Sequence, residues 1–153
     1  MADVLTPEQR QRNMSRIRGR DTTPEMLIRR GLHARGLRFR VQRKDLPGRP
    51  DLVFPRHRCV IQVHGCFWHR HGCPMSMLPK TRPEFWETKL TANVARDRDT
   101  KSRLLQSGWR VGIVWECAVR GSARIDKERL FHDVAGFVES GPESFEVSGQ
   151  WKV

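Results

Sequence analysis

The feature that most restricts the fold of this chain is a group of cysteines and histidines divided between one short segment and a distant position. Its members are Cys66, His69, His71, Cys73 and Cys117. A short loop that supplies three ligands, closed by one ligand from another element, matches the tetrahedral coordination of Zn²⁺ in structural sites. We therefore predict a closed, structural zinc site formed by Cys66, His71, Cys73 and Cys117. Spacing alone equally allows His69 in place of His71.

The charge of the chain points to a polyanionic partner. Its 29 lysines and arginines exceed its 17 acidic residues, which leaves a formal net charge of +12. Nucleic acid, an anionic membrane surface and an acidic protein all fit this charge. No apolar run reaches the roughly 18 residues of a membrane span, and the N-terminus lacks the apolar stretch of a signal peptide. We therefore expect a cytoplasmic protein whose cysteines are thiols or metal ligands.

The periodicity of apolar residues predicts a single α/β domain. Helices are predicted at residues 6–18, 24–35, 83–106 and 126–138, and strands at residues 37–42, 52–54, 59–64 and 109–115. The first three strands suggest an antiparallel meander, and the fourth is an interior strand. Thr23 is the expected cap of the second helix. Asp97 falls on the apolar face of the long helix, where a carboxylate needs a partner.

A second constellation carries the residue types that phosphodiester hydrolysis requires. Pro50 cannot lie inside a central strand, so Asp51 stands at the beginning of the strand that follows. Hydrolysis needs a hard cation held by carboxylate oxygens, an acidified water and a proton acceptor. Asp51 and the backbone carbonyl of Val63 are the expected Mg²⁺ ligands. A Pro-Asp pair alone usually marks a turn. The chain is basic, however, and it contains further residues suited to the same chemistry, namely His64, His69, Asp97 and Glu25.

A series of short segments forms a pattern that is more specific than any one of them. They are residues 13–22, 46–51 (LPGRPD), 59–61, 64–69 (HGCFWH), 85–86, 93–94, 96–98, 108–111 and 114–117. In this order they resemble the very-short-patch repair (Vsr) DNA mismatch endonucleases, over roughly residues 13–138. The resemblance implies a restriction-endonuclease-like α/β core, with a central mixed sheet flanked by helices and a structural zinc site. It also implies a Mg²⁺-dependent nick on the 5′ side of the thymine in a T·G mismatch, left by deamination of 5-methylcytosine.

The resemblance also implies a role for each candidate residue. It makes Asp51 the Mg²⁺ ligand, His69 the general base and Asp97 the group that orients it. His64 takes the place of a lysine in related nucleases and contacts phosphate, and Glu25 acts through water or a second metal. The zinc ligands implied by the family agree with those chosen from spacing, namely Cys66, His71, Cys73 and Cys117. Gln62 stands where many nucleases have a carboxylate, so the site is poor in negative charge.

Some apolar side chains are candidates for wedges that enter the base stack and so detect a mismatch by how easily the stack opens. Unstacking costs least where pairing is already poor. The candidates are Phe67, Trp68, Trp86, Met14 and Ile17. The resemblance implies that the three aromatic residues enter from the major groove and the other two from the minor groove. Trp86 shares a helical arc with Leu90, which alternatively makes it a core residue.

These inferences divide the chain into three parts: residues 1–20 as a DNA-contacting helix or arm, residues 21–138 as the catalytic domain, and residues 139–153 as a polar C-terminal tail. The expected partner is double-stranded DNA with a T·G mismatch, to which the protein binds as a monomer. We expect mismatch-repair proteins as further partners and no association with a membrane. Two other functions stay open. One is a sequence-specific restriction or mobile-element endonuclease acting on paired DNA, and the other is a non-catalytic, zinc-stabilised nucleic-acid-binding module.

Overall fold

The computed structural model of the protein describes residues 22–41 and 43–151, and five strands in these ranges form one sheet. In spatial order, which is also chain order, they are β1 (Arg40–Val41), β2 (Leu52–Phe54), β3 (Cys59–His64), β4 (Arg110–Trp115) and β5 (Ser144–Val147). β1 pairs antiparallel with β2 and β2 with β3, whereas β3 pairs parallel with β4 and β4 with β5. The predicted meander and interior strand are therefore confirmed, and the sheet is mixed.

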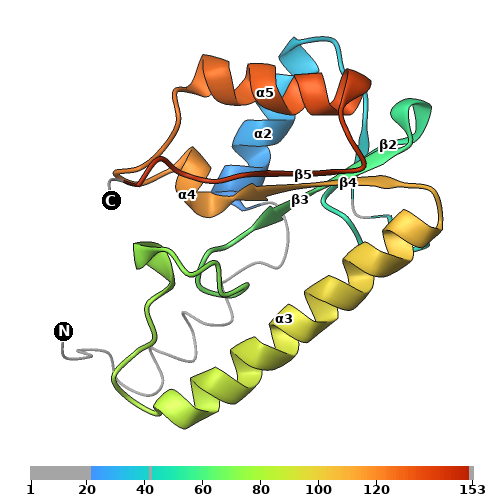
Figure 1. Ribbon diagram of the computed structural model, residues 1–153. Coiled ribbons are helices and arrows are strands. Elements are labelled where there is room, and N and C mark those ends of the chain that lie inside the picture. The colour runs from blue at the N-terminus through green and yellow to red at the C-terminus, as the bar shows by residue number, and fades with distance from the viewer. Residues whose placement is uncertain (1–21, 42, 152–153) are drawn as a thin grey trace.

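Helices cover both faces of this sheet. They are α2 (Thr23–Ala34), α3 (Pro83–Gln106), α4 (Glu116–Val119) and α5 (Lys127–Ser140), with short 3-10 turns η1 (Pro55–His57) and η2 (Pro74–Ser76). Figure 1 shows α2 and α5 on one face and the long α3 on the other. The α/β class with flanking helices is thus confirmed, while the helix predicted at residues 6–18 lies outside the described residues. None of the described helices combines the length and apolar character that crossing a membrane requires.

Local sequence signals explain the ends of α2 and α3. Thr22, rather than the expected Thr23, caps α2, because its hydroxyl accepts a hydrogen bond from the Glu25 N–H at 3.4 Å. Gly36 and Gly108 follow the two helices with φ of +88° and +87°. Glycine adopts this left-handed conformation without the steric cost that a Cβ atom brings, so it ends a helix readily.

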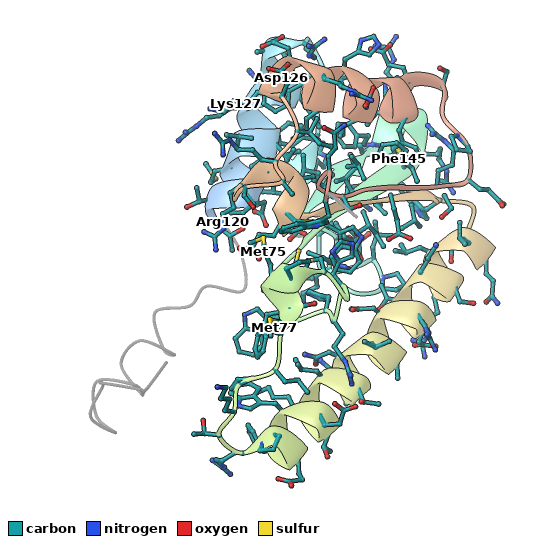
Figure 2. The ribbon with its side chains drawn as sticks, turned by 60° about the vertical axis from the view of Figure 1, so that its left-hand side comes forward. Met75, Met77, Arg120, Asp126, Lys127 and Phe145 are labelled. Atoms are coloured by element: carbon teal, nitrogen blue, oxygen red, sulfur yellow. The ribbon has the colours of Figure 1, made fainter. Side chains whose placement is uncertain are left out.

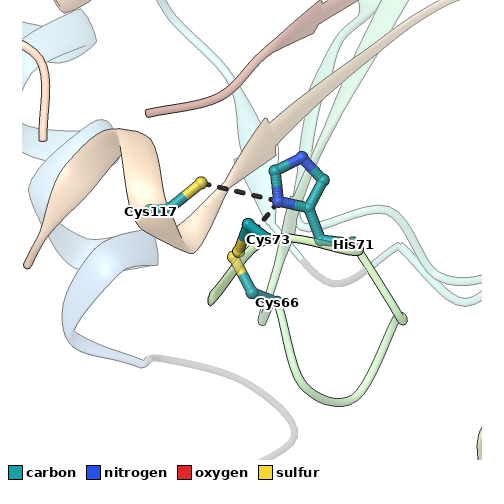
Figure 3. Close-up of side chains that lie close together, drawn as sticks. All are labelled: Cys66, His71, Cys73 and Cys117. Atoms are coloured by element: carbon teal, nitrogen blue, oxygen red, sulfur yellow. Dashed lines mark hydrogen bonds between the residues drawn. The ribbon is translucent and has the colours of Figure 1, made fainter. Parts of the chain in front are cut away.

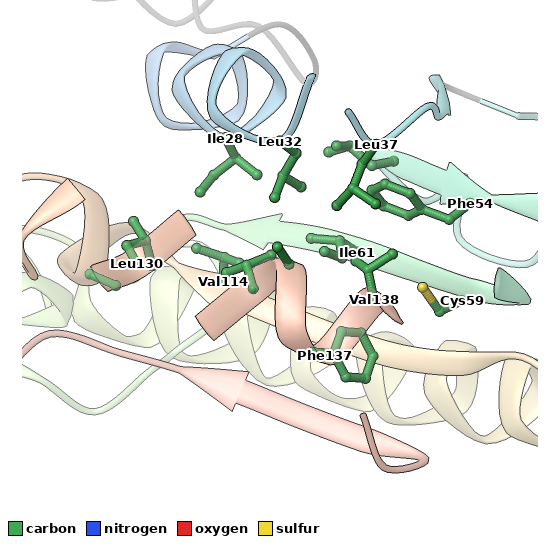
Figure 4. Close-up of a cluster of buried hydrophobic side chains, with 14 of the residues drawn as sticks. Ile28, Leu32, Leu37, Phe54, Cys59, Ile61, Val114, Leu130, Phe137 and Val138 are labelled. Carbon is green, nitrogen blue, oxygen red and sulfur yellow. The ribbon is translucent and has the colours of Figure 1, made fainter. Parts of the chain in front are cut away.

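The main core lies between the sheet and the layer formed by α2 and α5 (Figure 4). It contains Ile28, Leu32, Phe54, Ile61, Val114, Leu130 and Val138, all with no exposed surface. Burial of a side chain of this size stabilises a fold by about 1.5–3 kcal/mol. A smaller cluster packs on the opposite face and contains Val53, Val60, Leu104, Trp109 and Val111. Successive residues of β2 and β3 alternate between the two clusters, so both strands are buried on both faces.

The segment after Glu139 differs from the expected polar tail. Helix α5 continues to Ser140, and β5 then adds a parallel strand to β4. The apolar residues of this short strand explain its position. Phe145, which Figure 2 labels, stacks on Phe137 with ring centroids 5.0 Å apart, and Val147 packs against the main core. Two apolar residues at alternate positions are too weak a pattern to predict a strand from sequence.

Candidate active site and metal centre

Four of the predicted metal ligands meet at one end of the sheet, and we call them the metal centre: Cys66, His71, Cys73 and Cys117. Their ligand atoms all lie within 4.8 Å of one another. The Nδ1 atom of His71 is 3.6 Å from the sulfur of Cys66 and 3.5 Å from that of Cys117 (Figure 3). All four cysteines of the chain are free thiols. The metal centre can therefore hold a metal ion, and it contains His71 and not His69.

The strand order explains why these distant residues meet. Because β3 and β4 are parallel, the loop that follows β3 and the first turn of α4 begin at the same end of the sheet. The loop then turns tightly, since the His71 N–H donates to the Cys66 carbonyl at 3.0 Å and Gly72 has φ +90°. The Trp115 ring, at the end of β4, stacks on His71 with centroids 4.2 Å apart. Burial lowers the pKa of His71, which favours the neutral imidazole that binds metals.

A second layer of contacts around the metal centre comes largely from the C-terminal segment. The Gly149 N–H donates to the Cys117 sulfur at 3.1 Å, and the Trp115 indole N–H donates to Glu146 at 2.8 Å. A Cβ atom on Gly149 would lie 2.5 Å from the Cys117 carbonyl oxygen, so the backbones approach closely here. Trp151 packs against the same cluster. These contacts could not be predicted from the sequence, because residues 139–153 have the polar composition of a tail.

Beside the metal centre lies a pocket of about 580 Å³, which we call the catalytic pocket. Five of the predicted catalytic or cation-binding residues line it, namely Asp51, Val63, His64, His69 and, from α3, Asp97. Three cations also line it, which the sequence analysis did not single out: Lys44, Arg49 and Arg96. All three are exposed, so the pocket offers positive charge at its surface and acidic and imidazole groups inside.

The turn before β2 fixes the position of Asp51. Gly48 has φ +73°, and a Cβ atom there would lie 2.3 Å from the Thr100 side chain on α3. Only glycine allows the turn to pack this closely on the helix. The Asp51 carboxylate then accepts a hydrogen bond from the Val63 N–H on the neighbouring strand at 2.7 Å. The LPGRPD segment therefore presents Asp51 to the end of β3.

The charge state of Asp51 depends on its surroundings. Burial, followed by a hydrogen bond with Glu25 and the charge of Glu25, raises the pKa of Asp51 to about 8. The Val63 N–H and the positive charge of Arg29 act in the opposite direction. Glu25 is only 2% exposed and forms an ion pair with Arg29 one turn later on α2. The structure therefore places Glu25 next to Asp51 and adds Arg29, which the sequence analysis did not identify.

The two histidines of the catalytic pocket are stacked. The His64 and His69 rings have centroids 3.7 Å apart and planes 4° apart, and His69 Nδ1 lies 2.6 Å from an Asp97 oxygen. With Asp97 as acceptor, His69 carries its proton on Nδ1 and leaves Nε2 as the basic nitrogen. Burial, followed by the charge of His69, lowers the pKa of His64 to about 3, so His64 is neutral near pH 7.

The same three side chains lie within the mutual distance that a metal site allows. Their geometry favours acid–base chemistry instead. The lone pairs of an imidazole lie in the plane of its ring, and the rings of His64 and His69 are parallel, so these lone pairs do not converge on one point. Asp97 is already bound to His69. The arrangement suits an oriented base better than a cation site.

The three aromatic wedge candidates form one cluster. Phe67, Trp68 and Trp86 contact one another with ring centroids 5.1 to 5.8 Å apart. All three are partly exposed, and Trp86 packs against the loop aromatics rather than joining the buried core, where its alternative interpretation placed it. Phe85 extends the cluster through Trp86, at 5.2 Å. Met14 and Ile17 lie outside the described residues.

Comparison with known proteins identifies the family. Residues 2–75 match the family described as DNA mismatch endonuclease Vsr. The DNA mismatch endonuclease Vsr of Escherichia coli is 52% identical over 130 residues, which cover 85% of this chain and 83% of that protein. The chain belongs to the Vsr DNA mismatch endonuclease family. The resemblance predicted from the motifs is thereby confirmed, and so is the class of enzyme, a DNA endonuclease.

Other proteins similar to this chain carry a different name. The type II nicking enzyme V.XorIIP of Xanthomonas oryzae is 51% identical over 117 residues, covering 76% of this chain and 86% of that protein. The type II nicking enzyme V.NmeAIP of Neisseria meningitidis is 38% identical over 130 residues, covering 85% and 92%. All three relatives are named as nucleases, which disfavours the non-catalytic binding module considered from sequence.

Proposed function

We propose that this Vsr-family protein makes a Mg²⁺-dependent nick in double-stranded DNA, on the 5′ side of the thymine in a T·G mismatch. The observation that carries this proposal is the catalytic pocket, where the Asp51 carboxylate lies in the same cavity as the His69–Asp97 pair. A cation-binding carboxylate next to an oriented imidazole is the minimum that phosphodiester hydrolysis requires. The mixed sheet, with Asp51 at the start of one strand of an antiparallel pair, also fits a restriction-endonuclease-like core.

In this proposal Asp51 and the Val63 carbonyl hold Mg²⁺. The carboxylate fits such a hard cation, because oxygen is the ligand atom that Mg²⁺ prefers. When bound, Mg²⁺ makes a water molecule more acidic and polarises the phosphate. His69 Nε2 accepts the proton of the attacking water, and Asp97 keeps His69 in the required tautomer. The exposed Lys44, Arg49 and Arg96 contact neighbouring phosphates and position the strand.

The low pKa of His64 refines its proposed role. Because its pKa is about 3, His64 is neutral near pH 7 and offers no positive charge in the place of the nuclease lysine. Its Nδ1 is buried and has no hydrogen-bond partner among the described residues. We propose that His64 supports the His69 ring by stacking and contacts the phosphate as a neutral hydrogen-bond donor.

Zn²⁺ is the ion that best fits the metal centre. A tetrahedral zinc ion lies about 2.3 Å from sulfur and about 2.0–2.1 Å from nitrogen, which places those two atoms about 3.5 Å apart. The observed sulfur–nitrogen distances are 3.5 and 3.6 Å. All four coordination positions belong to the protein, so the ion is structural. It would fix the loop that carries both His69 and the aromatic cluster.

The aromatic cluster is the proposed mismatch sensor. Phe67, Trp68 and Trp86 would enter the stack from the major groove, and Met14 and Ile17 on the arm of residues 1–20 would enter from the minor groove. An apolar wedge opens a wobble pair at lower cost than a Watson–Crick pair, which gives selectivity without reading each base. The catalytic domain in this proposal begins at residue 21 and includes β5, and a single chain acts on the DNA.

A nicking assay on matched duplexes tests the proposal. We expect wild type to nick a T·G heteroduplex in Mg²⁺ and to leave the corresponding T·A duplex intact. Asp51→Ala should reduce nicking by at least about a hundredfold while preserving DNA binding, since it removes the cation ligand. Asp45→Ala is the matched control, because Asp45 forms an ion pair with Arg43 and does not line the catalytic pocket. Undiminished nicking by Asp51→Ala would refute the site assignment.

The same assay addresses a second candidate function, nicking of fully paired DNA at a specific sequence. The observation that favours it is the name type II nicking enzyme, which two of the three relatives described above carry. Equal nicking of the T·G and T·A duplexes would establish this second function in place of mismatch repair. Nicking confined to the heteroduplex would exclude it.

A further inference from the structure

The loop of residues 65–73 carries the proposed general base and is bound to α3 by successive residues. The Trp68 carbonyl accepts a hydrogen bond from the Asn93 side-chain amide at 3.1 Å. The next residue, His69, binds Asp97 at 2.6 Å. Both contacts are polar and only partly buried, so water competes for them. The position of His69 relative to its orienting carboxylate therefore depends on how firmly the loop and the helix are held together.

Helix α3 offers little buried apolar surface to hold this loop. Of its 24 residues, only Leu90, Thr100 and Leu104 are buried. Thr100 and Leu104 follow Asp97 in the helix, so the part of α3 before Asp97 has one buried side chain, Leu90. The aromatic cluster adds contacts that are partly exposed. Polar contacts must therefore contribute to fixing this part of α3 on the loop.

Arg70 makes two such contacts with α3. One nitrogen of its guanidinium donates to the Glu87 carboxylate at 2.7 Å and to the Thr91 hydroxyl at 3.0 Å. Glu87 and Thr91 are four positions apart on the helix, so their side chains are neighbours on one face. A hydrogen bond between ionised groups is roughly twice as strong as one between neutral groups. Two acceptors of α3 thus hold one cation of the loop.

Arg70 also stands between the two sites in the sequence. Its neighbours are His69, which lines the catalytic pocket, and His71, which belongs to the metal centre. Its φ of +49° lies in the left-handed region, which a residue with a Cβ atom keeps only where its surroundings impose it. The contacts of Arg70 with α3 supply such a constraint at the point where the loop directs one histidine to each site.

We propose that Arg70 is a positioning residue for the general base, His69. By binding Glu87 and Thr91, Arg70 holds the loop on α3 and so keeps His69 paired with Asp97. This inference rests on the proposed function, because it takes His69 as the general base. Arg70 does not line the catalytic pocket, so it acts through its neighbour. A displacement of about 1 Å at a catalytic group can slow a reaction about a hundredfold, even when the altered residue lies outside the site.

Single-turnover nicking of a T·G duplex at saturating enzyme tests the inference. Arg70→Met keeps the apolar stem and removes the charge, so it should slow nicking about tenfold, as expected for a slightly displaced base. Its affinity for the duplex should stay within about twofold of wild type, because no phosphate contact is lost. Arg103→Met is the matched control. It removes an exposed ion pair with Asp99 on the same helix and should nick at the wild-type rate.

Exchanging the two charges separates positioning from a contact with DNA. Arg70→Glu and Glu87→Arg each place like charges opposite one another and should slow nicking at least as much as Arg70→Met. The double variant restores an ion pair and should nick faster than either single variant. A double variant as slow as the singles would overturn the inference. So would weaker DNA binding by Arg70→Met with a shallower salt dependence, which indicates a phosphate contact.

A spectroscopic measurement tests the same inference without nicking. The ¹⁵N shifts of the neutral imidazole report which nitrogen of His69 carries the proton, with zinc bound and no DNA present. Wild type should show the Nδ1–H tautomer that Asp97 selects. Glu87→Ala leaves the loop sequence intact and should show a mixture of tautomers. An unchanged tautomer in this variant would overturn the inference, also where Arg70→Met fails to fold.

Failure of the proposed function gives a different result. His69→Ala would then retain nicking, whereas Glu87→Ala would still change the tautomer of His69. The reverse result, loss of nicking in His69→Ala with wild-type rates in Arg70→Met and Glu87→Ala, would keep the general base and overturn the positioning role of Arg70.

Discussion

The metal centre and the catalytic pocket lie at the same end of the sheet, but they present opposite environments to a metal ion. In the metal centre, Cys66 and Cys117 are fully buried, and the Gly149 N–H and the stacked Trp115 ring support the ligands from outside. In the catalytic pocket, Asp51 and the His69–Asp97 pair face a cavity that exposed cations surround. A closed set of soft ligands suits a permanent ion, whereas an open set of oxygen ligands suits an ion that must accept substrate.

Two histidines in one loop show how small the separation between these environments is. His69 and His71 are two positions apart, yet His71 joins the cysteines and His69 joins Asp97. The loop turns between them, because the His69 N–H donates to the Gly65 carbonyl and the His71 N–H to the Cys66 carbonyl. A structural ion in the metal centre would therefore also fix the position of His69, the proposed general base.

The largest difference between the two sites should appear when a ligand is removed from each. Cys73→Ser should abolish folding, because zinc binding contributes about 10–16 kcal/mol in small zinc domains, comparable with the total stability of about 5–15 kcal/mol of a folded domain. Metal content and the circular dichroism melt measure this effect. Cys59→Ala is the matched control and should keep one zinc ion, since Cys59 packs in the main core. A folded Cys73→Ser protein without metal would contradict the structural role.

In the catalytic pocket the corresponding change should affect rate and not folding. His69→Ala should reduce nicking by about 10²–10⁴-fold, which is the usual contribution of a general base. Its zinc content and DNA affinity should match those of wild type. The exposed His132→Ala variant serves as control and should nick normally. Single-turnover rates near wild type for His69→Ala would show that another group accepts the proton.

The raised pKa of Asp51 predicts how pH affects the catalytic pocket and, through it, the stability of the protein. The folded protein keeps a proton on Asp51 up to about pH 8, whereas an aspartate with the ordinary value of 3.8 has already lost it. Between these values the folded state binds more protons than the unfolded state, so this contribution to stability is lost as pH rises. Mg²⁺ needs the ionised carboxylate, so its affinity should increase over the same range.

Urea unfolding in buffer with zinc but without magnesium measures this effect. Wild type should lose stability relative to Asp51→Asn as the pH is raised from about 4 to about 8. The metal centre serves as an internal reference, because both proteins contain it. Parallel stability curves for the two proteins would show that Asp51 has no raised pKa in the folded state.

The smallest expected effect concerns the outer contacts of the metal centre. Gly149→Ala introduces a Cβ atom close to the Cys117 carbonyl and should displace the N–H that donates to the Cys117 sulfur. Loss of such an outer contact typically weakens metal binding by about 10–100-fold. The rate of zinc release to a chelator measures it. Gly136→Ala is the control, because a Cβ atom there meets nothing within 4 Å. Equal rates of zinc release from both variants would show that the C-terminal segment does not support the metal centre.

The parts of the fold that the sequence predicts are those with strong local signals. Gly36 and Gly108 mark the ends of two helices, and the apolar pattern of β4 is long enough to indicate an interior strand. β5 has only two apolar residues in alternation, so its pairing depends on contacts with α5 that no local pattern contains.

The candidate sites also combine residues that local sequence signals predict with residues that only the fold brings together. The four residues of the metal centre follow from residue type and spacing, apart from the choice between His69 and His71, which requires the turn of the loop. Arg29 could have been noticed four positions after Glu25, but its effect on Asp51 depends on how α2 packs on the sheet. Among the cations of the catalytic pocket, Lys44 and Arg49 come from the loop before β2 and Arg96 comes from α3, so only the folded chain brings them together.

The most direct test of the central claim is to locate the catalytic cation by anomalous diffraction from crystals grown with Mn²⁺ and a T·G-mismatched duplex. We expect an ion about 2.1 Å from an Asp51 oxygen, in contact with the phosphate 5′ to the mismatched thymine. A water molecule bound to this ion should lie within hydrogen-bonding distance of His69 Nε2. An ion bound elsewhere, with Asp51 directed away from the phosphate, would contradict the account.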